Sequence, residues 1–148
     1  MILLAHLLFG AAIGSSVKNI FLALILAFLA HYFLDLFPHI EYNIENIKEK
    51  QWRKALPAFV RVFIDFCLGI LLIFIFSNNQ PIIYVCAFLS ILPDVFSFLY
   101  IIWPNKILEA NYKFHTKIHF LKEKKISTFW RIFSQVLAVI ISIFILRF

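Results

Sequence analysis

Five long runs of apolar residues constrain the fold of this chain more than any other feature. They cover residues 2–17, 20–37, 56–76, 81–103 and 127–146, and each is close to the ~20 residues that a helix needs to cross a bilayer. A chain with 63% hydrophobic residues also lies far outside the range of ordinary soluble domains. We therefore expect an all-α, polytopic membrane bundle of about five transmembrane helices, forming one integral-membrane domain over residues 1–148. The first two runs are short, so packing in a thin membrane and a helical hairpin are both alternatives for them.

The positive charge of the chain is concentrated in two segments, which follow the second and the fourth apolar run. With five spans, both segments and the N-terminus lie on one face, and the positive-inside rule makes that face cytoplasmic. The expected location is a prokaryotic cytoplasmic membrane. Anionic lipid headgroups account for a net charge of +6, so no nucleic-acid partner is expected. The lysines and arginines concerned are Lys48, Lys50, Arg53, Lys54, Lys106, Lys113, Lys117, Lys122, Lys124 and Lys125.

Acidic residues and histidines are sorted along the chain. All five glutamates lie in the basic segments, whereas Asp35, Asp65 and Asp94 lie inside apolar runs. A carboxylate in hydrocarbon costs at least ~2.5 kcal/mol, so each of these aspartates needs a partner. An α-helix rises about 1.5 Å per residue. Measured in this way from the ends of the apolar runs, the three aspartates lie in the half of the bilayer nearer the basic segments. The histidines reach the same level; they are His6, His31, His39, His115 and His119.

The stretch "HYFLDLFPH" carries three of these groups at spacings of four, so His31, Asp35 and His39 share one helix face. Pro38 is expected to bend or end the helix there, because it removes a backbone donor. The later stretch "HTKIH" places His115 and His119 four apart on an amphipathic helix at the membrane interface, beside apolar residues that include Leu121.

Imidazole and carboxylate are the ligands that Zn²⁺, Mn²⁺ and Fe²⁺ accept in proteins. We expect two or three divalent ions, zinc above the others, because a two-metal centre activates water and stabilises the leaving oxygen in displacement at phosphorus. Asp65 and Asp94 are the expected catalytic carboxylates, and Arg61 and Arg131 are expected to bind the substrate phosphate. The predicted metal ligands are His6, His31, Asp35, His39, Asp65, Asp94, His115 and His119.

The stretches "AHLLFGAAIG", "HYFLDLFPH", "FIDFCLG", "LSILPD" and "HTKIH" resemble the predicted integral-membrane metal-dependent hydrolases over most of the chain. This resemblance implies a hydrolase without naming its substrate. The chain lacks the His-Arg-Gly and Thr-His-Ser stretches of some relatives, which indicates a divergent branch. The order His-Tyr-x-x-Asp-x-x-Pro-His is also similar to the metal motif of zinc-dependent phospholipase C. That similarity implies that His31, Asp35 and His39 are ligands and that Asp35 bridges ions, although the spacing before the last histidine is shorter here.

Simpler interpretations stand beside these. Arg61 lies one turn from Asp65 and could form an ion pair with it; His6 could be a hydrogen-bonded core residue; and Gly10 and Gly14 form a helix-packing face. The function expected from the sequence is hydrolysis of a phosphoester of a lipid or lipid-linked substrate at the cytoplasmic leaflet. The alternatives are a divalent-metal or proton transporter, and a non-catalytic membrane protein with a structural metal.

Overall fold

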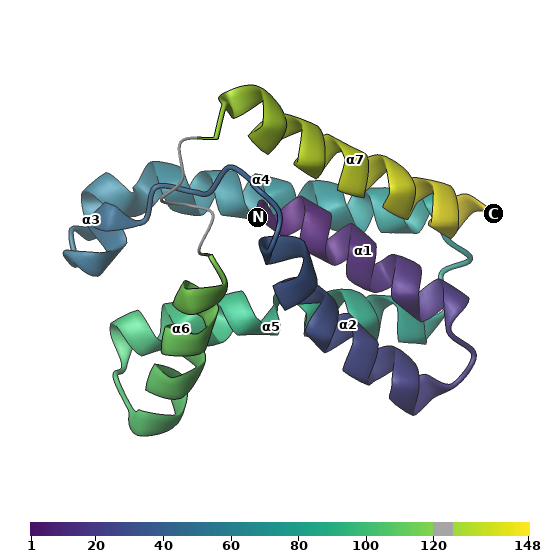
Figure 1. Cartoon of the computed structure of the whole chain (residues 1–148), viewed down its shortest axis with the longest axis horizontal. Helices are drawn as coiled ribbons and strands as arrows, with labels where there is room; N and C mark the ends of the chain where they lie inside the picture. Colours follow the sequence, from purple (N-terminus) through teal and green to yellow (C-terminus); the bar gives the residue numbers. More distant parts are fainter. Residues whose placement is uncertain (120–125) are drawn as a thin grey trace.

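The computed structural model describes residues 1–119 and 126–148, and this part of the chain is entirely helical, without strands. The expectation of an all-α fold is therefore confirmed. Four of the helices run roughly alongside the central helix α1, and α6 packs across one end of the bundle (Figure 1). The helices are α1 (Leu3–Ser16), α2 (Ile20–Asp35), α3 (Glu45–Lys48), α4 (Trp52–Phe76), α5 (Pro81–Ile102), α6 (Lys106–Ile118) and α7 (Thr128–Arg147).

Three helices, α4, α5 and α7, are long and apolar enough to cross a membrane. This is fewer than the five spans predicted, because α1 and α2 have only 14 and 16 residues. These lengths correspond to about 21 and 24 Å, short of the ~30 Å hydrocarbon core. The apolar runs include residues that form turns: α1 stops at Ser16, and α2 stops three residues before Pro38. The two helices form a hairpin, which was the alternative left open by their length.

Helix α1 lies at the centre of the molecule and packs against α2, α4, α5 and α7. Nine of its 14 residues are buried. Helix α2, by contrast, buries one side and exposes large apolar side chains on the other, where Phe21 and Ile25 are 79% and 59% exposed. A bundle with a buried central helix and apolar outer surfaces is suited to surrounding lipid, which agrees with the spans found in α4, α5 and α7.

Two glycines allow α1 to approach α5 closely. A Cβ atom added at Gly10 would lie 2.7 Å from the backbone oxygen of Cys86, and one at Gly14 would lie 2.9 Å from the Cα atom of Ile83. Both positions lack the space for a methyl group. The expected packing face at Gly10 and Gly14 is therefore confirmed, and it brings the first turns of α1 beside the middle of α5.

Helix α6 begins at the cap residue Asn105, whose side chain accepts hydrogen bonds from the backbone amides of Ile107 and Leu108. It docks on the bundle through Asn111, which accepts a hydrogen bond from the Tyr32 hydroxyl and donates one to the carbonyl of Pro93. The amphipathic helix expected around "HTKIH" is thus present. Leu121 of its expected apolar stripe and the loop lysines Lys122, Lys124 and Lys125 lie outside the described residues.

Replacing Gly10 by alanine should destabilise the protein more than the same change at Gly69, by about 1–3 kcal/mol. At Gly10 the new methyl group meets the fixed backbone of α5, whereas at Gly69 the nearest atom is the end of the flexible Leu7 side chain. Both variants gain the same helix propensity, so the difference isolates the packing. Thermal unfolding of the two proteins in one detergent measures it, and equal midpoints would contradict this account of the α1–α5 contact.

Candidate metal centre

The carboxylate of Asp35 lies at the C-terminal end of α2, is almost fully buried, and is surrounded by nitrogen atoms. The Met1 ammonium lies 2.6 Å from its Oδ1 atom. All five histidines of the chain place their Nε2 atoms around the same carboxylate, and they come from α1, from α2 and the segment after it, and from the end of α6. The distances to the nearest oxygen of Asp35 are 3.3 Å for His6, 3.1 Å for His31, 3.7 Å for His39, 3.0 Å for His115 and 3.2 Å for His119.

The other ring nitrogen of several histidines is held by an acceptor, which fixes the position of the ring proton. The Nδ1 atom of His31 lies 2.7 Å from the carbonyl oxygen of Ser90, which can only accept, so Nδ1 donates. The Nδ1 atom of His115 lies 2.9 Å from the hydroxyl of Ser97, which itself donates to the carbonyl of Pro93. In the neutral rings both Nε2 atoms then carry the lone pair and lie toward Asp35, the arrangement in which histidine binds metal ions. In a protonated ring Nε2 would instead donate to the carboxylate, and Nε2 of His115 lies 3.0 Å from Oδ2 of Asp35.

These lone pairs also face one another. The Nε2 atom of His115 lies 3.1 Å from that of His31 and 3.0 Å from that of His119. Two lone pairs at this distance repel unless a proton or a cation lies between them. In a tetrahedral zinc site with Zn–N bonds of 2.0–2.1 Å, two ligand nitrogens lie about 3.3 Å apart. The observed spacings are close to that value, so the arrangement of the rings fits a shared cation.

A second part of the cluster is formed where the chain turns back after α2. Pro38 follows the end of this helix, as expected, and His39 folds inward and is buried. Its Nδ1 atom donates to the carbonyl of Phe37 at 2.6 Å, so in the neutral ring Nε2 carries the lone pair, and this atom has no hydrogen-bond partner. This lone pair lies 3.7 Å from Asp35 and 3.5 Å from Oε1 of Glu41. A lone pair between two carboxylates again indicates a place for positive charge.

The imidazole of His119 completes this second part. Its Nδ1 atom lies 2.9 Å from Oε1 of Glu41, an ionic contact without the alignment of a hydrogen bond. Burial lowers the pKa of His119, but its contacts with Asp35 and Glu41 outweigh burial and raise that pKa to about 9. In the absence of another cation the ring therefore holds a proton at neutral pH, so the cluster again favours positive charge.

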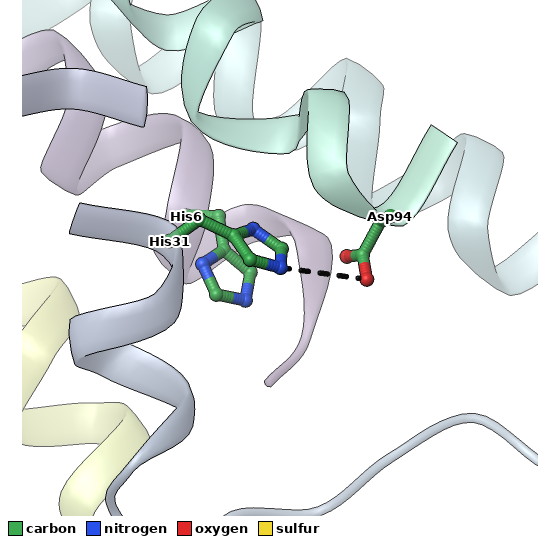
Figure 2. A group of neighbouring side chains, drawn as sticks. All are labelled: His6, His31 and Asp94. Carbon is green, nitrogen blue, oxygen red and sulfur yellow. Dashed lines mark ion pairs between the residues drawn. The ribbon is translucent and has the colours of Figure 1, made fainter. Parts of the chain in front are cut away.

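A third part is formed by α1, α2 and α5. The rings of His6 and His31 stack with centroids 4.1 Å apart and face the carboxylate of Asp94 on α5 (Figure 2). Asp94 lies 3.7 Å from the Nε2 atoms of both His31 and His115. Both ring nitrogens of His6 are buried and lack a hydrogen-bond partner, which is costly for a polar group. Its Nε2 atom nevertheless contacts Asp35 at 3.3 Å, so the interpretation of His6 as a core histidine held by Asp35 stays open beside that of a metal ligand.

Three groups of side chains have the geometry to hold a metal ion, with ligand atoms within 4.8 Å of one another. Two of the groups share Asp35 and two share His31, so the sites are contiguous. This arrangement is what a cluster with a bridging carboxylate needs. The groups are His6 with His31 and Asp94; His31 with Asp35 and His115; and Asp35 with His39 and His119.

Asp65, which the sequence analysis also predicts as a ligand, lies outside these groups. It accepts a hydrogen bond from the Tyr42 hydroxyl, which in turn accepts one from the backbone amide of Leu3 at 3.0 Å. Burial and the hydrogen bond to Asp65 raise the pKa of Tyr42, so its hydroxyl stays protonated. No ion pair joins Arg61 and Asp65 within the part of the chain that the structure describes. The role of Asp65 in metal binding remains a prediction, and its observed role is to connect α4 to the start of α1.

The two predicted phosphate-binding arginines differ in position. Arg131, near the start of α7, donates a hydrogen bond to the carbonyl of His39 at 3.2 Å. It lines a small cavity of about 10 Å³ beside Asp35, His39 and Glu41, which has room for one water molecule but not for a phosphate. Arg61 is exposed on α4 and lines neither this cavity nor the larger one described next. Both phosphate-binding roles remain predictions.

A larger cavity of about 450 Å³ opens beside the cluster, between α4, α5, α6 and residues 41–48. Asp94, His115 and His119 line its polar end, and the remaining walls are mainly apolar. The side chain of Asp94 is 36% exposed, whereas that of Asp35 is fully enclosed. The cluster is therefore accessible through Asp94 and closed around Asp35.

Several residues that shape the site have no conspicuous pattern in the sequence. Glu41 resembles the other loop glutamates, and Ser90, Ser97 and Asn111 are ordinary polar residues near helices. The signal that could have found Ser90 and Ser97 is their position on α5, one turn before and one turn after Asp94. A hydroxyl at these positions lies on the same helix face as Asp94.

Comparisons with protein-family models, with curated proteins and with solved structures found no match for this chain. The resemblance to membrane metal-dependent hydrolases therefore remains a prediction from the motifs.

Changing Tyr42 to phenylalanine should destabilise the protein by about 1–3 kcal/mol, because it leaves the Asp65 carboxylate and the Leu3 amide without their shared partner. The matched control is Tyr84→Phe, which removes a hydrogen bond to the exposed Asn79 at the opposite end of the bundle. Thermal unfolding in detergent checks the prediction. A Tyr42→Phe midpoint as high as that of the control would show that the Tyr42 hydroxyl contributes nothing to stability.

Proposed function

We propose that the protein is a membrane-embedded, metal-dependent hydrolase that cleaves a phosphoester of a lipid or lipid-linked substrate. The observation that carries this proposal is the sharing of Asp35 by two adjacent donor groups, with the lone pairs of His31 and His115 held toward it. Imidazoles and carboxylates suit two or three divalent ions, Zn²⁺ before Mn²⁺ or Fe²⁺. When bound, such ions lower the pKa of water and stabilise negative charge on phosphate oxygens.

Different residues of the cluster have different roles in the proposed reaction. Asp35, the enclosed carboxylate common to two donor groups, would hold the ions together, and Ser90 and Ser97 accept hydrogen bonds from the Nδ1 atoms of His31 and His115. Asp94 is the carboxylate that reaches the cavity, so it is the best placed to accept a proton from an attacking water. In the step, the water oxygen would bond to phosphorus, the ester P–O bond would break, and the proton that Asp94 took from the water would pass to the departing alcohol oxygen.

The membrane setting favours a substrate that is itself in the membrane. Counted along α5, Asp94 lies eight residues, or about 12 Å, before the end of a helix long enough to span the bilayer. The two basic segments flank this same end of the bundle, as expected from their positions in the sequence. By the positive-inside rule we assign this end to the cytoplasmic side of a prokaryotic membrane, so the site opens to the cytoplasmic leaflet.

Transport of a metal ion or proton, the alternative from the sequence analysis, finds less support. An ion path needs polar groups through both leaflets. Beyond the cluster, α1 packs into a core of buried apolar side chains that includes Leu7, Leu8, Ile73 and Ile83. Within the described residues, this core separates the cluster from the 77–80 turn at the other end of the bundle.

The proposal takes the three donor groups as the metal site and leaves Asp65 out of it. It predicts that Asp35→Asn loses at least half of the bound metal, whereas Asp65→Asn keeps it. Both changes remove one negative charge from an aspartate in an apolar helix, but only Asp35 belongs to donor groups, namely two of the three, whereas Asp65 bonds to Tyr42. Elemental analysis of the detergent-purified proteins measures the metal content. A folded wild-type protein without metal, or equal loss in the two variants, would contradict the metal centre as proposed.

Hydrolysis is tested separately with a panel of phosphoesters that differ in their apolar substituent. Cleavage should stop on chelation and return when Zn²⁺ or Mn²⁺ is added. A protein that keeps its metal but cleaves no member of the panel would contradict the enzymatic proposal and favour a structural metal.

A further inference from the structure

The walls of the 450 Å³ cavity are more apolar than the chemistry of the cluster requires. A hydrolytic site needs room for water and for a phosphate, both of which are polar. Here α4 contributes Phe59 and Val62, and α5 contributes Val95, Phe98 and Ile101. The rings of Phe59 and Phe98 meet edge to face with centroids 5.8 Å apart, so the two helices present a continuous apolar surface.

The cavity changes character along its length. Asp94 and Ser97 on α5 belong to its polar end, and Ile101 lies about 10 Å further along the same helix. Its volume falls within the 300–1,000 Å³ that hold a drug-sized ligand. A sugar or nucleotide in the apolar part would lose its water without gaining hydrogen-bond partners. A hydrocarbon group there would gain from leaving water.

The charges at the polar end of the cavity make the binding of a phosphate dependent on metal. Asp94 and Glu41 line the cavity together with one lysine, Lys48. The two carboxylates outnumber this single lysine and repel an anionic phosphate at the polar end unless further cations neutralise them. The phosphate of a ligand therefore binds next to the cluster when metal is present, whereas contacts between the apolar walls and a hydrocarbon chain do not depend on metal. The two halves of the ligand can be tested independently.

We propose that this cavity binds the hydrocarbon chain of a single-chain alkyl or isoprenoid phosphate, with the chain along Phe59, Phe98 and Ile101 and the phosphate at Asp94 and the histidines. This inference rests on the proposed function and names its substrate class.

The test is photo-crosslinking with octylphosphonate that carries a diazirine near the end of its chain, because eight extended methylene carbons span about 10 Å, the distance along α5 from Asp94 to Ile101. The carbon–phosphorus bond of this probe resists hydrolysis, so labelling does not depend on turnover. In the metal-loaded protein the crosslinks should map to peptides that contain Phe59, Phe98 or Ile101. Methylphosphonate, which offers the same phosphorus group without the chain, should displace the probe only at concentrations at least a hundredfold higher.

Two variants fill the cavity from opposite walls, Ala58→Trp on α4 and Ile101→Trp on α5, and each should reduce labelling about tenfold. The matched control is Val60→Trp, because the Val60 side chain lies on α4, is 48% exposed and does not line the cavity. Metal content and thermal unfolding report whether each variant is folded. Because the two tryptophans are introduced on different helices, one variant still tests the proposal if the other fails to fold.

Labelling that is confined to outward-facing residues, or that is equal in the wild-type protein and the folded cavity variants, would overturn the inference. Displacement by methylphosphonate at the same concentration as the probe would do so as well, because the chain would then add nothing. If crosslinks map to the cavity but the metal-loaded protein cleaves no phosphoester, the hydrocarbon site is supported and the proposed hydrolase is contradicted.

Discussion

The carboxylate of Asp35 is the constraint on which the rest of this structure depends. A buried negative charge is tolerated only where positive charge or hydrogen-bond donors surround it. Here the surrounding groups are five imidazoles and the Met1 ammonium, contributed by segments from Met1 to His119. Helices that are far apart in the sequence therefore all contact the Asp35 carboxylate. The packing of the rest of each helix has to be compatible with this contact.

The packing of α1 shows how that compatibility arises. His6 reaches Asp35 only because α1 runs through the centre of the bundle, and α1 fits there because Gly10 and Gly14 let it lie against α5. On α5 the hydroxyl of Ser90 lies 2.7 Å from the carbonyl of His6, and the carbonyl of Ser90 accepts from His31. One short segment of α5 thus fixes the position of two histidines from two other helices. The close packing at Gly10 and Gly14 and the positions of the histidines in the cluster therefore depend on each other.

Sequence reasoning could predict the parts of the site that are costly to bury. His31, Asp35 and Asp94 stand out because ionisable groups in apolar runs need partners, and the spacing of four residues places His115 and His119 on one helix face. It could not distinguish Asp65 from the other two aspartates, because its partner Tyr42 lies in a loop 23 residues away. It also overestimated the spans, since the apolar run from residue 20 to 37 continues past the end of α2. Hydropathy records composition, whereas the helix ends depend on Pro38 and on side-chain contacts with the cluster.

The accessibility of the cluster bears on which class of metal site it resembles. Structural metal sites are closed by protein ligands, whereas catalytic sites keep a position open to water or substrate. Asp35 satisfies the first description, since it is enclosed by histidines and the Met1 ammonium. Asp94 satisfies the second, since more than a third of its side chain is exposed and it borders the large cavity. A protein that used cations only to join its helices would gain nothing from leaving Asp94 open. An apolar cavity that ends at this carboxylate therefore supports the proposed chemistry on a bound ligand over the alternative of a purely structural metal.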